Sequence, residues 1–309
     1  MKNLKFDFMS KQKIAMICSV SLILIGVGSL IVKGLELGID FTGGTLVEVG
    51  YQQEADLTQI RKVLSENGFN DAVVQYFGNN QDVLIRLAPT EGAGKDKISE
   101  QVLLALKQQT EDLKLRRVEF VGPQVGDELK NDGGLAILYT LFGILLYVGL
   151  RFEYRFAVAA IIALIHDVLI TIGIFSLLGM EFNLTILAAI LAVIGYSLND
   201  TIVVFDRIRE NFRLLRKDTS ANIINISLNE TLSRTLITSL TTLLVLLSLA
   251  IFGGEIIFGF AFALIVGVFV GTYSSIYVAS SSVLALGISK EDLMVPIKEG
   301  ADQGGLEQL

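Results

Sequence analysis

The sequence predicts a polytopic α-helical membrane protein with six transmembrane helices and one α+β domain outside the cytoplasm. Of the 309 residues, 52% are hydrophobic and 18% are charged, with a mean hydropathy of +0.59. Soluble domains of this length rarely contain so much apolar sequence. Six apolar runs are each long enough to cross a bilayer, which takes about 20 helical residues. The segment 33–132, between the first two runs, is polar and patterned like a folded domain.

The distribution of Lys and Arg gives the orientation of the spans. Lys and Arg gather in the N-terminal tail, in 151–155 and in 207–217, whereas 179–183 and 252–255 contain neither. Cytoplasmic loops carry the excess of basic residues, so both termini are predicted to be cytoplasmic. In chain order, the predicted segments are a cytoplasmic tail (1–13), span one (14–32), the extracytoplasmic domain (33–132), span two (133–150), span three (156–178), span four (184–205), a cytoplasmic loop (206–232), span five (233–252), span six (256–286) and a cytoplasmic tail (287–309).

Composition also excludes several classes of protein and site. The single cysteine, Cys18, excludes an internal disulfide framework and a CxxC metal or redox site. A net charge of −7 gives no indication of nucleic-acid binding. The basic start followed by an apolar run resembles a signal peptide, but the run of about 19 residues is longer than the usual apolar core of 7–15. Bulky Ile17 before Cys18 argues against a lipoprotein, so the first span is read as an uncleaved anchor helix.

The outer segment reads as an α+β domain. Alternation predicts strands over 45–51, 72–78, 82–88 and 114–122, and apolar residues at helical spacing predict helices over 56–68 and 96–109. Asn79-Asn80-Gln81 marks a hairpin between the two central strands. The order βαββαβ is that of a ferredoxin-like domain. An unclassified α+β domain is the alternative.

Two Gly-containing motifs flank this domain, LGIDFTGGT (37–45) and VGPQVGDEL (121–129). A phosphate-binding loop is disfavoured, because the first motif leads into a strand rather than opening a helix with GK[ST]. We instead expect two structural elbows, in which glycines permit tight turns where the chain leaves and re-enters the membrane. The elbow residues are Asp40, Gly43, Gly44, Gly122, Pro123 and Gly126, with Asp40 bracing the first turn and Pro123 and Gly126 redirecting the chain before span two.

Charged side chains within the spans are the strongest functional signal. Such a residue costs roughly 2.5–3.5 kcal/mol at a helix centre on insertion scales, and it usually faces a bundle interior. Asp200, beside Asn199, lies about 10 Å before Arg207 at a rise of 1.5 Å per residue. Arg234 lies at a similar depth in span five, and the pair His166-Asp167 lies near the middle of span three.

These residues predict a proton pathway. Asp200 and Arg234 lie on adjacent antiparallel helices, so Arg234 is a candidate counter-ion that keeps the carboxylate ionised. A carboxyl that alternates between paired and desolvated states takes up and releases a proton. His166, the only histidine, is a candidate relay. Two readings stay open: Arg234 snorkels to the interface, and His166 is structural.

A proteolytic alternative uses the same carboxylates. Asp167 and Asp200 would share a proton and activate water, as in an aspartyl protease. The local sequence SLND (197–200) differs from the GxGD pattern typical of the intramembrane enzymes, which disfavours this reading.

Two long motifs lie in the later spans, IGYSLNDTIVVFDRIREN (194–211) and LNETLSRTLITSLTTLL (228–244). Together with the two elbow motifs, they resemble the SecF family, the smaller membrane subunits of the bacterial SecD–SecF protein-export complex. The resemblance covers essentially the whole chain. It implies half of an RND-type transporter in the bacterial inner membrane. It also implies three partners, SecD, the SecYEG channel and YajC, and a translocating preprotein as cargo.

The resemblance further implies that the proton-motive force drives preprotein translocation and release on the outer face. Asp200 and Arg234 would then belong to a proton pathway at the interface with SecD. No enzymatic activity, cofactor or metal is implied, because protons are the coupling ion. The alternative is half of an RND-like proton-driven exporter of small molecules or lipids.

Overall fold

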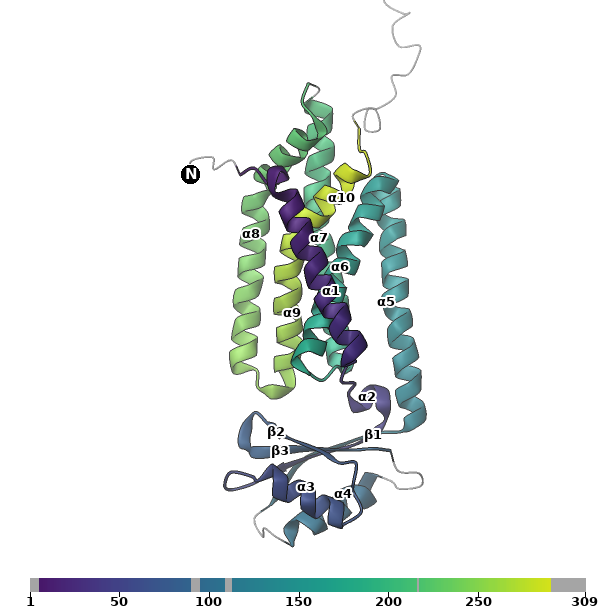
Figure 1. Ribbon diagram of the computed structural model, residues 1–309, viewed down its shortest axis with the longest axis vertical. Coiled ribbons are helices and arrows are strands. Elements are labelled where there is room, and N and C mark those ends of the chain that lie inside the picture. Colours follow the sequence, from purple (N-terminus) through teal and green to yellow (C-terminus); the bar gives the residue numbers. More distant parts are fainter. Residues whose placement is uncertain (1–5, 90–94, 109–112, 216, 290–309) are drawn as a thin grey trace, which may run out of the picture.

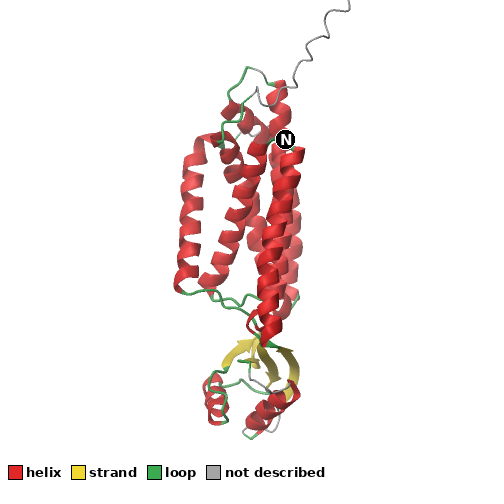
Figure 2. Ribbon diagram, turned by 90° about the vertical axis from the view of Figure 1, so that its right-hand side faces the viewer, coloured by secondary structure: helices red, strands yellow, loops and turns green. Residues whose placement is uncertain are grey.

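The computed structural model describes residues 6–89, 95–108, 113–215 and 217–289. A bundle of long helices carries a four-stranded sheet at one end (Figure 1). Figure 2 shows that the sheet, with its two helices beyond it, forms a separate body beneath the bundle. In the described part of the chain, six helical segments are long and apolar enough to cross a membrane. The predicted fold class is thus confirmed. The long helices are α1 (Gln12–Val32), α5 (Pro123–Arg151), α6 (Tyr154–Leu178), α7 (Leu184–Leu214), α8 (Ser220–Phe252) and α9 (Glu255–Ser274).

Short helices complete the bundle at the end opposite the sheet. A 3-10 helix, η1, covers Met9–Lys11 ahead of α1. After α9 the chain continues as a π-helix, η2 (Ser275–Ala279), and as α10 (Ser280–Ala285). A π turn inside a long helix commonly marks a functional site. The residue before it, Ser274, is one of the site residues described below.

The outer domain has the order βαββαβ, with all neighbouring strands antiparallel. The strands are ordered β2-β3-β1-β4 in the sheet, as in a ferredoxin-like domain. Helices α3 and α4 cover the face turned away from the bundle, and the other face is turned toward it (Figure 1). The elements are β1 (Gly44–Gly50), α3 (Leu57–Glu66), β2 (Val73–Phe77), β3 (Asn79–Leu87), α4 (Lys95–Lys107) and β4 (Lys114–Val121).

Local chemistry explains several element boundaries. The Asp56 side chain accepts hydrogen bonds from Thr58 N and Gln59 N and so caps α3. Asn183 caps α7 in the same way by accepting from Ile186 N at 3.1 Å. In the predicted hairpin the turn is centred on Gly78, with a φ of 76°, so β3 begins at Asn79 rather than at 82. The Asn79 side chain accepts from Gln81 N and Asp82 N within the strand itself.

Three predicted boundaries differ from the structure. Helix α5 begins at Pro123, well before 133, because proline fits the first helical position and its missing N–H needs no partner there. Most of the predicted loop 206–232 is helical, since α7 ends at Leu214 and α8 begins at Ser220. Hydropathy marks only the lipid-length part of a helix and not its polar extension. The predictions for residues 1–5 and 290–309 lie outside the described residues.

The two elbow motifs pack against each other. Gly43 and Gly44 have φ values of 70° and 125°, which favour glycine. A Cβ on Gly43 would lie 2.9 Å from Pro123 Cα, and one on Gly126 would lie 2.7 Å from Gly43 N. Pro123 and Gly126 lie within the continuous helix α5 rather than in a turn before it. Gly122 is not restricted in this way, because a Cβ there would meet open space.

Asp40 does not brace the turn in which it lies. Its Oδ2 atom accepts a hydrogen bond from Leu184 N at 2.9 Å, at the first residue of α7. The sequence did not indicate this partner, which lies 144 residues away in the chain. Asp40 therefore joins the start of the outer domain to the N-terminus of α7, where a carboxylate is favoured by the unpaired backbone N–H groups.

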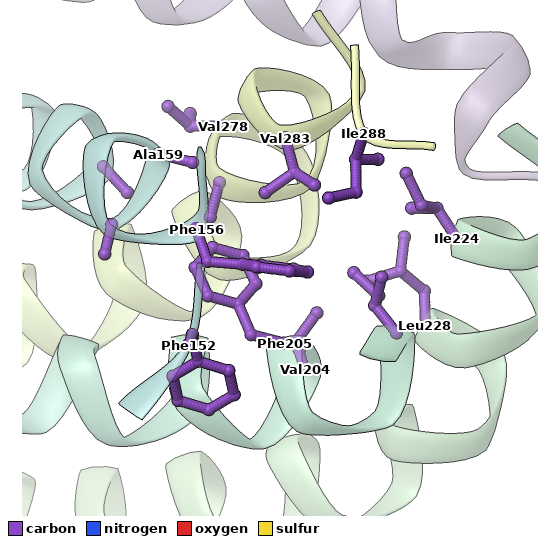
Figure 3. Close-up of a cluster of buried hydrophobic side chains, with 14 of the residues drawn as sticks. Phe152, Phe156, Ala159, Val204, Phe205, Ile224, Leu228, Val278, Val283 and Ile288 are labelled. Carbon is purple, nitrogen blue, oxygen red and sulfur yellow. The ribbon is translucent and has the colours of Figure 1, made fainter. Parts of the chain in front are cut away.

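Two apolar clusters divide the bundle along its length. One lies toward the end opposite the sheet, where Phe152, Phe156 and Phe205 pack against side chains of α8 and α10 (Figure 3). The other lies toward the sheet and includes Phe175 and Ile190. Along α7, Ile194 belongs to the sheet-side cluster and Val204 to the opposite one, so the polar residues between them form a layer inside the bundle.

Small residues on α9 allow α7 to approach closely. A Cβ on Gly271 would lie 3.0 Å from Ser197 Cβ, and one on Gly267 would overlap the Val193 side chain. Gly259, Ala263, Gly267 and Gly271 recur every four residues along α9, and such a stripe of small residues favours close helix contact. Their packing brings the polar residues of α7 and α9 into the same layer.

The variant Gly267→Ala is expected to destabilise the bundle by about 1–3 kcal/mol, the usual effect of an extra carbon in a filled core. The matched control is Gly259→Ala, because a Cβ there would meet only Ile186 Cδ1, the movable end of a side chain, at 3.0 Å. Thermal unfolding of the purified proteins in detergent measures both effects. Equal midpoints for the two variants would contradict this account of α7–α9 packing.

Candidate functional site

Asp167 is held between three helices in the polar layer. Its side chain is completely buried. Oδ2 accepts hydrogen bonds from Ser197 on α7 at 2.5 Å and from Ser274 at the end of α9 at 2.8 Å. Oδ1 lies 2.8 Å from His166 Nδ1. Both carboxylate oxygens are therefore engaged, which satisfies a buried group that would otherwise be very costly.

His166 is part of the same buried cluster. Its ring is 3% exposed, and it stacks on Tyr273 with ring centroids 6.2 Å apart. Nε2 has no hydrogen-bond partner among the described residues. The His166 ring and the Asp167 carboxyl are hydrogen-bonded to each other and buried among the helices. This geometry favours a structural role, in which the two residues hold the helices in position.

Asp200 lies in a second, incomplete cluster. It is 3% exposed and faces α8, where the Ser239 hydroxyl lies beside its carboxyl group. Its Oδ2 atom has no hydrogen-bond partner within the described chain. Ser239 Oγ lies 2.7 Å from Thr272 Oγ1 on α9, and Tyr196 O–H reaches Ser239 at 3.4 Å. A buried carboxyl with one oxygen unpaired is suited to gain or lose a proton.

The two clusters are mechanically linked through α7 and α9. Ser197 and Asp200 are three residues apart on α7, so they lie on neighbouring positions of one helix face. Thr272 and Ser274 lie close together at the end of α9, immediately before the π-helix. A change at Asp200 therefore acts on the same two helices that Asp167 holds together.

Arg234 does not form the predicted direct pair with Asp200. The ion pairs among the described residues do not include these two side chains, although the Arg234 charge acts on the Asp200 carboxyl. Arg234 is exposed on α8, and Asn199 is exposed on α7, so neither is enclosed in the buried cluster that contains Asp200. The prediction that the two residues lie on neighbouring helices agrees with the packing of α7 against α8.

The two buried carboxyl groups do not form a shared-proton pair. Asp167 is fully engaged by His166, Ser197 and Ser274, whereas Asp200 is engaged by Ser239. The protease reading requires both to act on one water. Across the described ranges, His, Cys, Asp and Glu side chains form no group of three able to hold a metal ion.

Sequence reasoning missed three hydroxyl partners, Ser239, Thr272 and Ser274. Each lies on an inward-facing position of a membrane helix, and Ser239 and Ser274 are buried. A signal was present, since hydroxyl residues recur at four-residue spacing along one buried face of α8, at Ser227, Thr231, Thr235 and Ser239. Hydroxyl residues are common in membrane helices, so the sequence does not show which of them contact the carboxylates.

Comparison with known families places most of the chain in a protein-export group. The family "Protein export membrane protein SecD/SecF, C-terminal" matches residues 101–289, and the "SecD/SecF GG Motif" matches residues 28–55. The second match contains the elbow glycines Gly43 and Gly44.

Relatives are similar over nearly their full length. Protein translocase subunit SecF of Vibrio alginolyticus is 54% identical, over 96% of this chain and 95% of the relative. The SecF subunit of Pseudomonas aeruginosa is 50% identical, over 94% of each chain. Among solved structures, SecDF of Thermus thermophilus, a translocon-associated membrane protein, matches with a TM-score of 0.83 and 42% identity.

That match covers 91% of this chain and 38% of the SecDF chain. The chain thus spans well under half of the SecDF chain. Its six apolar helices and its SecF relatives make it a multi-pass membrane component of protein transport. The chain belongs to the SecD/SecF family of protein-export membrane proteins, among its SecF translocase subunits.

Proposed function

We propose that this chain pairs with SecD in the bacterial inner membrane and uses the proton-motive force to promote preprotein translocation through SecYEG, with release on the outer face. YajC is proposed as a further member of the complex. Basic residues gather at the end of the bundle opposite the sheet, which supports placing that end and both termini in the cytoplasm. The observation that carries the proton coupling is the buried Asp200 carboxyl with Oδ2 unpaired.

Protonation of Asp200 would complete a chain of hydroxyl hydrogen bonds that runs from α7 to α9. Thr272 donates to Val268 O at 2.7 Å, which leaves its oxygen free to accept from Ser239 at 2.7 Å. Neutral Asp200 donates to Ser239, so the chain runs in one direction through to α9. Ionised Asp200 instead accepts from Ser239, which then has no hydrogen left for Thr272. Each proton taken up or released would therefore change how α7, α8 and α9 are joined.

The outward face of α7 supports a tightly packed partner helix. Its exposed residues at helical spacing are small or polar, and small residues let membrane helices approach closely. They are Thr185, Ala188, Ala192, Gly195 and Asn199. We propose that SecD covers this face together with Arg234 on α8. Arg234 and Asn199 would then take part in the proton pathway at the subunit interface, while Asp167 and His166 would position it.

The test uses proteoliposomes containing the chain with SecD and SecYEG, with ATP-driven export started before a proton gradient is imposed. We expect the gradient to accelerate completion of export and a protonophore to remove that acceleration. The same preparation lacking this chain is the control. Acceleration that is equal with and without the chain would refute the proposal.

The rival function, half of a proton-driven small-molecule or lipid exporter, needs a substrate cavity. A cavity of about 610 Å³ lies between the sheet and the outer ends of α7 and α9. Co-purification of SecYEG with the chain and SecD distinguishes the two functions, because an exporter has no reason to bind a protein channel. Recovery of the complex free of SecYEG, with gradient-driven lipid or dye efflux, would favour the exporter.

A further inference from the structure

The outer domain is attached to the bundle at a junction beside the start of α7. Leu37, which follows α1, forms a parallel bridge with Phe182, which precedes α7. Gly38 N donates to Phe182 O at 2.8 Å, and Phe182 N donates to Glu36 O at 2.7 Å. The backbone leading into the sheet is thus hydrogen-bonded to the backbone leading into the helix of Asp200.

One ion pair extends this junction into the sheet itself. Arg86 lies on β3 two residues after Leu84, so the two side chains are on the same face of the sheet. That face is turned toward the bundle (Figure 1). Its guanidinium forms an ion pair with Glu181, and its Nη1 donates to Leu37 O at 3.2 Å. The two side chains are only 18% and 22% exposed. Arg86 therefore contacts both chain segments of the junction, the one after α1 and the one before α7.

Glu181 lies close to the first turn of α7. It is two residues before Asn183, which caps that helix, and Asp40 accepts from the backbone of Leu184 beside it. A displacement of α7 along or about its axis moves this turn directly. Since Glu181 is bound to Arg86, the same displacement acts on β3.

The Arg86–Glu181 pair lies among other charged groups and beside a cavity. Burial raises the pKa of Glu181, while Arg86 offsets part of that rise and Asp40 and Glu119 add to it. The pair also lines the cavity of about 610 Å³, whose other charged residues are Glu36, Asp40, Arg117, Glu119 and Glu255. Space beside the pair allows the guanidinium and carboxylate to shift without unpacking a filled core.

We infer that Arg86 and Glu181 are positioning residues that transmit the movement of α7 to the outer domain. This inference rests on the proposed proton-driven function, in which Asp200 changes the packing of α7. A purely structural role would alter only the stability of the domain. A transmitting role makes the outer domain respond to the gradient through this one charged contact.

The sheet offers a matched control. Arg117 and Glu119 form an ion pair on the same face and line the same cavity, but both lie on β4 and so join nothing to the bundle. Glu181→Gln and Arg86→Gln remove the junction pair. Arg117→Gln removes the control pair, and the double reversal Arg86→Glu with Glu181→Arg restores an ion pair at the junction.

Two readouts separate transmission from stability in proteoliposomes with SecD and SecYEG. The first is gradient-accelerated export. The second is the distance between labels on α3 and α6, attached through Lys62→Cys and Leu178→Cys in a Cys18→Ser background, with and without the gradient. Lys62 and Leu178 are both exposed, so labels there leave the junction intact.

We expect the wild type and Arg117→Gln to show a gradient-induced distance change. Glu181→Gln and Arg86→Gln should lose it and lose about 5-fold or more of the acceleration, the low end of coupling between sites. The double reversal should restore both. If single variants prove too unstable to purify, the double reversal decides alone: a folded protein without the distance change overturns the inference.

The possible failures are distinguishable. A wild type that shows neither acceleration nor a distance change would refute the proposed function itself. A wild type that shows both, together with an unchanged response in Glu181→Gln, would refute only the role of the junction pair. An equal loss in Arg117→Gln would also refute it, because that pair does not reach the bundle.

Discussion

Asp200→Asn is expected to abolish the acceleration of export by a proton gradient while ATP-driven export continues. Asparagine has nearly the same shape and keeps a hydrogen bond with Ser239, but it neither binds nor releases a proton. One charge crossing 100 mV supplies about 2.3 kcal/mol, a factor of roughly 50 in an equilibrium, and the variant loses access to all of it. The rate of export with and without a protonophore measures the effect.

Asp206→Asn is the matched control. Asp206 lies on the same helix, but its side chain is 61% exposed and 3.8 Å from Arg151, so its charge is already solvated. Gradient-accelerated export should be unchanged in this variant. Full acceleration in Asp200→Asn, or its loss in Asp206→Asn, would argue against the assigned role of Asp200.

Asp167→Ala is expected to lower the stability of the bundle strongly, by about 3–5 kcal/mol, as when one partner of a buried charged network is removed. The change leaves Ser197, Ser274 and His166 without their common acceptor at the contact of α6, α7 and α9. Thermal unfolding in detergent should show a lower midpoint. Asp200→Asn should leave the midpoint nearly unchanged, because its carboxyl is only partly engaged.

Ser274→Ala provides the graded control for this network. It removes one donor to Asp167 and should destabilise by about 1 kcal/mol, the ordinary net value of one hydrogen bond. A normal midpoint in Asp167→Ala combined with complete loss of gradient-driven export would assign Asp167 to proton transfer instead of positioning.

The sequence was sufficient to predict the architecture, because the architecture follows from local patterns. Span length and hydropathy identified the six membrane helices, and alternation with turn residues identified the strands of the outer domain. The unusual burial of Asp200 was also predictable, since no residue near it in the sequence permits its charge to reach water. These features depend on neighbours within one or two turns of the chain.

The contacts of the site were not predictable in the same way. Asp40 binds Leu184, and Asp167 binds Ser274, across more than one hundred residues in each case. Which hydroxyl meets which carboxylate depends on the rotation of each helix and on how closely glycines let the helices approach. For the same reason the sequence placed Arg234 and Asp200 on neighbouring helices but did not show whether their side chains meet. Residue spacing fixes depth along a helix far better than orientation between helices.

The most direct test of the account is an infrared difference spectrum of the chain in complex with SecD, recorded as the pH on the outer side is lowered. Protonation of a buried carboxylate gives a carboxylic acid band that is distinct from the carboxylate bands. We predict that this band appears in the wild type and in Asp206→Asn and is absent in Asp200→Asn. A band of undiminished intensity in Asp200→Asn would show that another group takes up the proton, and would contradict the account.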